Sequence, residues 1–354
     1  MTNITSQQSN RIEGLDLIRT VAILLVVFIH GMTPGSNKLE YINNLSDFLK
    51  IFHFTWFSVG RLGVPLFFFL SGYLLLTKQY DREKTKRFFR HNFLSLLLTW
   101  EIWILIYNIS ISYYEGTPFN WSSLFKNMLF IKPTEVFHAW YMEVILGIYL
   151  FLPYISRALH RMSNNEILAM LLISFVYFFI VPTLNHFKSS QWHASLNLYF
   201  SGGLYGFYLI VGYLIKVYEE QLKNLSKPMV TILIFVTIAA TTLAQMYASA
   251  GGKIYHIWYD FCLLPITALF IFICLKDMQC KSFSRLITTI SKCSFGIYLI
   301  HVLFLVVFFK SDLLYFIGIE ELRIIISPSI SFIVSLFIVI SLKKIPHLGS
   351  ILFR

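Results

Sequence analysis

An arginine and a histidine in one apolar stretch near the N-terminus are the residues best suited to chemistry. The stretch GLDLIRTVAILLVVFIHG holds Arg19 and His30, eleven residues apart. On an α-helix this spacing is about 1100°, within roughly 20° of three full turns, so both side chains lie on one face, about 16 Å apart along the axis. Asp16, one turn before Arg19, is placed to pair with it. A histidine can act as a general base near neutral pH, and an arginine can hold a phosphorylated donor.

The same two residues also fit a structural interpretation. Arg19 could extend to the headgroups at one membrane surface, and His30 could be a hydrogen-bonded residue of the core. A titratable side chain within a membrane span is costly, however, and is by default a functional hypothesis. In that hypothesis one helix connects a cytoplasmic donor site at Arg19 with a reaction site at His30, in the outer part of the bilayer.

Further polar residues gather at the two ends of the predicted spans. The segment KQYDREKTKRFFRHN carries Arg87 and Arg90 on one face of a helix start, where they either bind phosphate or act as ordinary positive charges of a cytoplasmic loop. On the outer side, Arg61 and Glu143 lie at similar depth. This predicts either a salt bridge between them or a role for Glu143 in orienting His30 or a substrate hydroxyl.

The composition indicates that a membrane protein positions these residues. Of the 354 residues, 56% are apolar and 13% are charged, and the mean hydropathy is +0.66. Soluble domains average about 45–50% apolar and about 25% charged residues, so a soluble enzyme, a disordered chain and a secreted disulfide scaffold are excluded. We predict an all-α polytopic protein of about ten transmembrane helices, with Pro182 ending the fifth. The predicted spans are 15–33, 54–76, 92–114, 137–155, 167–184, 198–216, 229–248, 255–275, 293–310 and 322–342.

The distribution of lysine and arginine predicts the sidedness. With the N-terminus inside, the inner segments hold roughly twice as many Lys and Arg residues as the outer ones, which indicates that both termini are cytoplasmic. The net charge of +11 is then explained by topology and by attraction to anionic lipid, so nucleic acid is not an expected partner. The four cysteines have no metal-ligand spacing, and we expect free thiols and no metal.

Known catalytic and packing motifs add little. The sequence contains no GxxxxGK[ST] loop, no GxSxG elbow and no HExxH pair. Gly202, Gly203 and Gly206 are expected to permit close helix packing, within the chain or between the chains of a homo-oligomer. His301 lies near the middle of the ninth predicted span, where it could simply be a packed polar residue.

Several of these segments together resemble the acyltransferase family 3 of membrane proteins. Arg19 and His30 match the family's Arg-x10-His pattern in the first span, and Arg87 and Arg90 match its Arg-x-x-Arg after the second. GVPLFFFLSGYLL, HAWYMEVILGIYLFLP and SKCSFGIYLIH, which ends at His301, are similar to its second-, fourth- and ninth-span segments. The wording RLGVPLFFFLSGYLL and HAWYMEV most resembles the branch that includes the enterobacterial common antigen O-acetyltransferase.

The resemblance implies transfer of an acetyl group from acetyl-CoA to a hydroxyl of an extracytoplasmic carbohydrate or lipid-linked glycan, in a bacterial cytoplasmic membrane. His30 would be the catalytic base, or would accept the acetyl group itself, and Arg19 would belong to the donor site. Arg87 and Arg90 would contact CoA phosphates. The acceptor is expected near Arg61, Trp140, Glu143 and His301. Residues 1–354 would form a single transmembrane domain, without the C-terminal extracytoplasmic hydrolase-like domain of many members.

Two other classes of protein fit the residues alone. A polysaccharide or lipid-linked sugar exporter would also have about ten spans and polar residues at several depths, although inverted repeats and paired broken helices are not evident. A membrane sensor or assembly partner without catalysis would make the spacing of Arg19 and His30 accidental. Binding to a CoA matrix would separate the enzyme from both.

Overall fold

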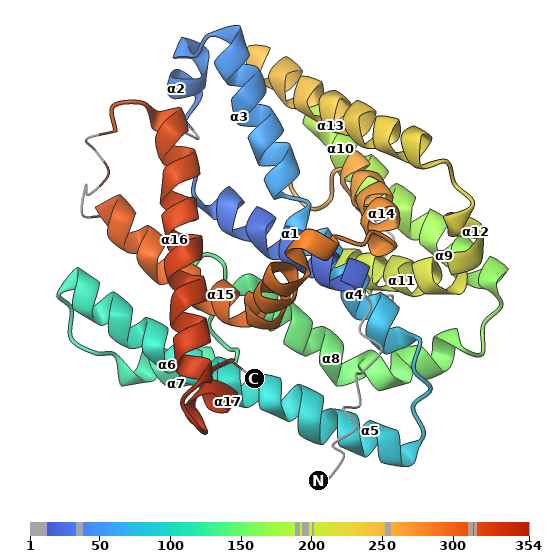
Figure 1. Ribbon diagram of the computed structural model, residues 1–354, viewed down its shortest axis with the longest axis horizontal. Coiled ribbons are helices and arrows are strands. Elements are labelled where there is room, and N and C mark those ends of the chain that lie inside the picture. Colours follow the sequence, from blue (N-terminus) through green and yellow to red (C-terminus); the bar gives the residue numbers. More distant parts are fainter. Residues whose placement is uncertain are drawn as a thin grey trace.

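The computed structural model describes residues 13–32, 38–187, 192, 198–199, 202–251, 256–310, 314 and 317–353, and its regular elements in these ranges are helices (Figure 1). Seven helices among the described residues are long and apolar enough to cross a membrane. They are Asp47–Leu76 (α3 Asp47–Gly60, α4 Gly63–Ser71, η1 Gly72–Leu76), Arg82–Glu115 (α5 Arg82–Phe88, η2 Phe89–Phe93, α6 Leu94–Glu115), α8 Trp140–Leu159, Asn164–Phe187 (α9 Asn164–Phe175, η3 Val176–Ile180, α10 Val181–Phe187), α13 Lys227–Ala250, Lys281–Phe309 (η5 Lys281–Phe283 and most of α15 Ser284–Lys310) and α16 Glu320–Lys343.

Three shorter helices complete the apolar set. Two of them, α11 Gly203–Val217 and α14 Leu263–Lys276, are apolar up to a lysine in the last turn, whereas α1 Glu13–His30 carries ionisable residues in its first two turns. Four further helices are short: α2 Leu39–Asn44, α7 Trp121–Met128, α12 Glu219–Lys223 and α17 Leu348–Phe353. Each predicted span overlaps a helix, although positions 33, 200–201 and 255 lie outside the described residues.

The all-α class and the multi-pass arrangement are therefore confirmed. The count of about ten spans and the cytoplasmic location of both termini stay predictions. We name the two ends of the bundle after the residues of α1 that lie there: the Arg19 end and the His30 end.

Helix α1 lies in the middle of the molecule (Figure 1). It packs against α3, α4, α14, α15 and α16. Most of its apolar side chains are buried in these contacts, including Ile18, Ile23 and Val27. A central helix with neighbours on most sides can enclose a polar face away from lipid, which is the arrangement that Arg19 and His30 require.

Pro182 does not end the fifth predicted span, contrary to the sequence prediction. The helix continues through α10 to Phe187. A proline inside a helix lacks one N–H group and its ring crowds the preceding turn. Here the turn before it, Val176–Ile180, is a π-helix, in which each hydrogen bond spans five residues. This wider turn accommodates the proline, so the helix is not broken.

Close helix contact at α11 occurs at Gly212, which was not among the glycines expected to pack. A Cβ atom on Gly212 would lie 2.2 Å from the carbonyl oxygen of Phe69 on α4, and one on Gly72 would lie 1.8 Å from the carbonyl oxygen of Leu209. These two glycines let the backbones of α4, η1 and α11 touch. Gly202 and Gly203 have φ angles of 89° and 62°, so they form the turn that starts α11.

Candidate active site

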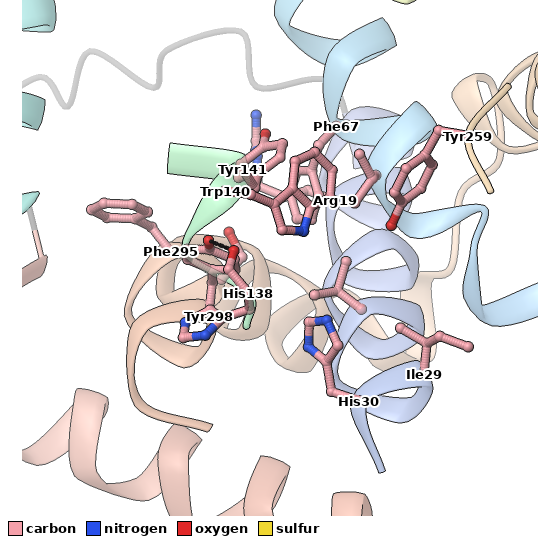
Figure 2. A pocket seen from close by; sticks show the side chains of 13 residues that line it. Arg19, Ile29, His30, Phe67, His138, Trp140, Tyr141, Tyr259, Phe295 and Tyr298 are labelled. Carbon is pink, nitrogen blue, oxygen red and sulfur yellow. Dashed lines mark hydrogen bonds between the residues drawn. The ribbon is translucent and has the colours of Figure 1, made fainter. Parts of the chain in front are cut away.

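A cavity of about 190 Å³ lies beside α1 and joins the two residues singled out by the sequence. Figure 2 shows it from close by. Its lining comes from α1, α4, α8 and α15, and from the segments that precede α8 and α14. The residues are Arg19, Val26, Ile29, His30, Val64, Phe67, His138, Trp140, Tyr141, Tyr259, Ser294, Phe295 and Tyr298. The predicted common face of Arg19 and His30 is therefore a face of one cavity, mostly apolar with a few polar groups, as is typical of small-molecule sites.

The imidazole rings of His30 and His301 lie edge to edge in nearly parallel planes, 13° apart, with centroids separated by 5.2 Å. Nδ1 of His30 lies 2.9 Å from Nε2 of His301. Nδ1 of His301 lies 2.7 Å from the carbonyl oxygen of Tyr298 on its own helix, α15. A carbonyl only accepts, so Nδ1 of His301 carries a hydrogen and its Nε2, when the ring is neutral, accepts. It follows that His30 donates from Nδ1 and keeps the lone pair on Nε2.

A third histidine, His138, belongs to the same group and was missed in the sequence. Its ring centroid lies 5.3 Å from that of His301 and 6.1 Å from that of His30. The hydroxyl of Tyr107 donates to the carbonyl oxygen of Leu299 at 2.6 Å and accepts from Nε2 of His138 at 3.2 Å. Nδ1 of His138 is buried and has no hydrogen-bond partner among the described residues. Its signal in the sequence is that it begins the segment HAWYMEVILGIYLFLP, two residues before Trp140.

Arg19 is held at the other end of the cavity by a three-membered polar contact. Its guanidinium donates to Asp16 at 3.2 Å, which confirms the predicted pairing, and to the hydroxyl of Ser291 at 3.0 Å. That hydroxyl donates in turn to Asp16 at 2.7 Å. Asp16 is buried, so pairing offsets part of the cost of removing both charges from water. The contact joins α1 to α15 and fixes the direction of the arginine.

A second cavity of about 470 Å³ continues from Arg19 away from His30. It shares Arg19, Tyr141 and Phe295 with the central cavity, so the two are adjacent. Its other lining residues come from the Arg19 end of the bundle: Ser71, Leu96, Met142, Ile145 and Tyr149. The molecule thus has a series of hollows that runs from the Arg19 end to His30.

A third hollow, here called the basin, opens between α5 and α8 and has a volume of about 780 Å³. It is lined by Gln79, Tyr80, Asp81, Arg82, Lys84, Arg157, Ala158, His160 and Arg161. Arg157 is already bonded, since its Nε donates to the carbonyl oxygen of Tyr80 at 2.6 Å. Arg87 and Arg90 are exposed one to two turns further along the same helix and do not line the basin.

A row of aromatic rings connects the basin with the second cavity. The centroid of the Phe88 ring lies 5.5 Å from that of Tyr80, in the basin, and 5.6 Å from that of Tyr149, in the second cavity. At the start of α5, Asp81 accepts from the backbone N–H of Lys84 at 2.7 Å, and this bond lowers the pKa of the Asp81 carboxyl. Asp81 therefore stays charged as the cap of the helix that presents the arginines.

The predicted salt bridge between Arg61 and Glu143 does not form. The guanidinium of Arg61 lies 4.3 Å from the ring centroid of Trp258 and 4.8 Å from that of Phe57. Glu143 accepts instead from the backbone N–H of Thr134 at 3.4 Å. Glu143 does not orient His30 either, because that contact belongs to His301. Similar depth placed these residues together in the prediction, but the helices present them to different neighbours.

Among the described residues, no group of three or more His, Cys, Asp or Glu side chains is arranged to hold a metal ion. The four cysteines are free, as expected.

The comparison with protein families identifies the class of protein. The family model Acyl_transf_3, described as an acyltransferase domain, matches residues 12–342, nearly the whole chain. The chain therefore belongs to the acyltransferase family 3, and its general activity is acyl transfer by a multi-pass membrane protein. Neither the curated proteins nor the solved structures gave a significant match.

Proposed function

We propose that this protein moves an acetyl group from cytoplasmic acetyl-CoA to a hydroxyl of a cell-surface carbohydrate or lipid-linked glycan, at the outer face of a bacterial cytoplasmic membrane. One observation carries the proposal: the free lone pair of His30, set by the bond to His301, lies in a cavity that continues past Arg19 to the opposite end of the bundle. The resemblance to the O-acetyltransferase branch of the family agrees with it.

The donor side of the proposal rests on the basic residues at the Arg19 end. If this end is cytoplasmic, as the lysine and arginine distribution predicts, the phosphates of CoA meet the arginines of α5 and η2 and of the basin. Arginine suits phosphate because its planar guanidinium can donate two parallel hydrogen bonds. The thin pantetheine arm then follows the second cavity, and the thioester reaches the central cavity beyond Arg19.

The acceptor side of the proposal rests on the residues at the His30 end. The acceptor hydroxyl enters near Trp140, Tyr259 and Arg61, and His30 removes its proton as the oxygen attacks the thioester carbonyl. This step requires neutral His30, so the rate falls at acid pH. The central cavity, at about 190 Å³, favours a short acyl group such as acetyl over a long chain.

The test is acetyl-CoA turnover by purified protein in nanodiscs, followed as release of free thiol, with wild type beside His30→Ala. Membrane extract is added as a source of acceptor, and label from the acetyl group is traced into its carbohydrate. We expect His30→Ala to lose at least about a hundredfold in rate, the scale of a general base. His91→Ala, on the exposed side of η2, serves as the matched control and should keep the wild-type rate.

Calorimetric titration with CoA on the same samples completes the experiment. We expect wild type and His30→Ala to bind CoA equally, because His30 lies beyond the donor's phosphates. A wild-type rate in His30→Ala would contradict the catalytic role. Absence of both binding and release in wild type would contradict the enzyme and favour the exporter.

A further inference from the structure

Two hydrogen-bond donors face His30 across the central cavity. In Figure 2 the indole nitrogen of Trp140 and the hydroxyl of Tyr259 lie on the edges of their rings that face the imidazole of His30, and both residues line the cavity. Trp140 starts α8, and Tyr259 lies in the segment before α14, so the pair comes from elements on a different side of the cavity from α1.

Both donors lack an acceptor among the described residues. The indole N–H of Trp140 only donates, and it makes no hydrogen bond within the described part of the chain. The oxygen of Tyr259 accepts from the guanidinium of Arg61 at 3.4 Å. Because a guanidinium only donates, this bond uses the oxygen of Tyr259 and leaves its hydrogen free to point into the cavity. The cavity therefore presents an N–H and an O–H group opposite a base.

Arg61 strengthens the second of these donors. Its charge is held among the rings of Phe57, Trp258 and Tyr259, with centroids 4.8, 4.3 and 5.4 Å from the guanidinium carbon. No carboxylate of the described residues forms an ion pair with it. A cation bonded to the oxygen of a phenol polarises its O–H bond, and an apolar surrounding weakens this effect less than water does.

We propose that Trp140 and Tyr259 form the oxyanion hole of the acyl transfer, with Arg61 as the positioning residue of Tyr259. The inference rests on the proposed function and assigns two further catalytic residues to it. Donors that are already in place where negative charge develops are the largest single contribution in many acyl transfers.

The transfer passes through one addition step and one elimination step. The acceptor oxygen forms a bond to the thioester carbonyl carbon, and its proton passes to Nε2 of His30. The carbonyl electron pair moves to the oxygen, which becomes an oxyanion and accepts from the Trp140 N–H and the Tyr259 O–H. When the carbonyl re-forms, the carbon–sulfur bond breaks and the thiolate takes the proton from His30. The products are the acetyl ester and the free thiol of CoA.

The variants Tyr259→Phe and Trp140→Phe test the inference, because each removes a donor and keeps an aromatic ring. We expect each to lower kcat for acetyl-CoA turnover about 10²–10³-fold, the loss seen when one oxyanion donor is removed. The KM for acetyl-CoA and the Kd of CoA should stay within about threefold of wild type. Tyr205→Phe is the matched control, since its ring lies 5.4 Å from that of Trp140 but does not line the cavity.

The role of Arg61 is tested by a measurement that loss of packing alone would not change. We expect Arg61→Met to lower kcat about tenfold in the wild-type background and less than twofold in the Tyr259→Phe background, because its effect passes through the tyrosine hydroxyl. Equal losses in the two backgrounds would overturn the positioning role.

The wild type and His30→Ala are assayed in the same series. A rate that depends on His30 but changes less than threefold in both Tyr259→Phe and Trp140→Phe would overturn the oxyanion hole and leave the proposed function intact. A rate that does not depend on His30 would overturn both. If Tyr259→Phe fails to fold, Trp140→Phe decides alone.

Discussion

A backbone carbonyl determines which nitrogen of His30 carries the hydrogen, and it acts through a second imidazole. The carbonyl of Tyr298 fixes the hydrogen on His301, and His301 fixes the hydrogen on His30. The hydrogen-bond partner of one ring nitrogen of a histidine decides whether the other nitrogen is free. The same logic operates across the cavity, where Arg61 leaves the hydroxyl hydrogen of Tyr259 free. The hydrogens of His30 and Tyr259, the proposed base and one proposed donor, are thus placed by the neighbours His301 and Arg61.

We expect His301→Phe to lower kcat about 10²–10⁴-fold, because Phe removes the acceptor for Nδ1 of His30 and leaves its tautomer unfixed. His301→Gln keeps an acceptor oxygen and an N–H donor, so it should stay within about tenfold of wild type. The measurement is thiol release, with thermal unfolding in detergent as the control for folding. Equal losses in both variants would show that His301 acts only through packing.

The residues of the site differ in how far the sequence could predict them. Arg19 and His30 lie on one helix, whose geometry is fixed by hydrogen bonding, so their common face could be derived. His301 is 271 positions from His30, and their contact depends on how α1 packs against α15, which no local pattern specifies. The prediction of a salt bridge between Arg61 and Glu143 was wrong for the same reason. The depth of a residue in its span follows from the local sequence, whereas its contact partner depends on how the helices pack.

At the scale of elements, two sets of arginines lie at the Arg19 end, at and beside the start of the span Arg82–Glu115. Arg82 lines the basin together with Arg161 of the turn after α8, whereas Arg87 and Arg90 are exposed further along. The resemblance to the family favours the second pair as contacts of CoA, and the shape of the surface favours the first. The two sets can be separated by substitution.

We expect Arg87→Ala to raise the KM for acetyl-CoA about tenfold with little change in kcat, since one charge-assisted hydrogen bond to phosphate is worth roughly 1.5 kcal/mol or more. Arg82→Ala and Arg161→Ala are measured in the same assay. Lys227→Ala, an exposed cation at the start of α13, is the control and should leave KM unchanged. If KM rises only in the basin variants, Arg87 is a topological charge and the phosphates lie in the basin.

Two predictions about elements were wrong because the local backbone accommodated a proline and two glycines in a different way from the one expected. Pro182 was expected to end a helix, but a π-helical turn over Val176–Ile180 precedes it and the helix continues. Gly202 and Gly203 were expected to pack helices together, but their positive φ angles form a turn, and Gly212 makes the close contact. A sequence shows where a glycine or a proline lies. It does not show whether the glycine forms a turn or a close helix contact, or whether the proline ends its helix.

At the scale of the whole molecule, the proposed reaction requires that the Arg19 end faces the cytoplasm. We expect a single cysteine at Ser122, on α7 at the His30 end, to react with an impermeant maleimide in intact spheroplasts. A single cysteine at Ser163, before α9 at the Arg19 end, should react only after lysis. Both are made in a background without the four native cysteines. The reverse pattern would invert the sidedness of donor and acceptor.

The junction of the two cavities at Arg19 also bears on the insulation of the membrane. A water-filled passage that admits a donor from one side and an acceptor from the other would let protons run down their gradient. Phe295 lines both cavities at the junction, and apolar side chains such as Val26 and Phe67 line the central cavity beyond it. Narrow apolar constrictions tend to lose their water. Arg19 lines both cavities, whereas its partner Asp16 lines neither, so the junction presents a positively charged group to hydronium and other cations. In the proposed reaction, Arg19 would thus serve between turnovers as an electrostatic barrier, so that passing an acyl group across the bilayer would not require the protein to conduct ions.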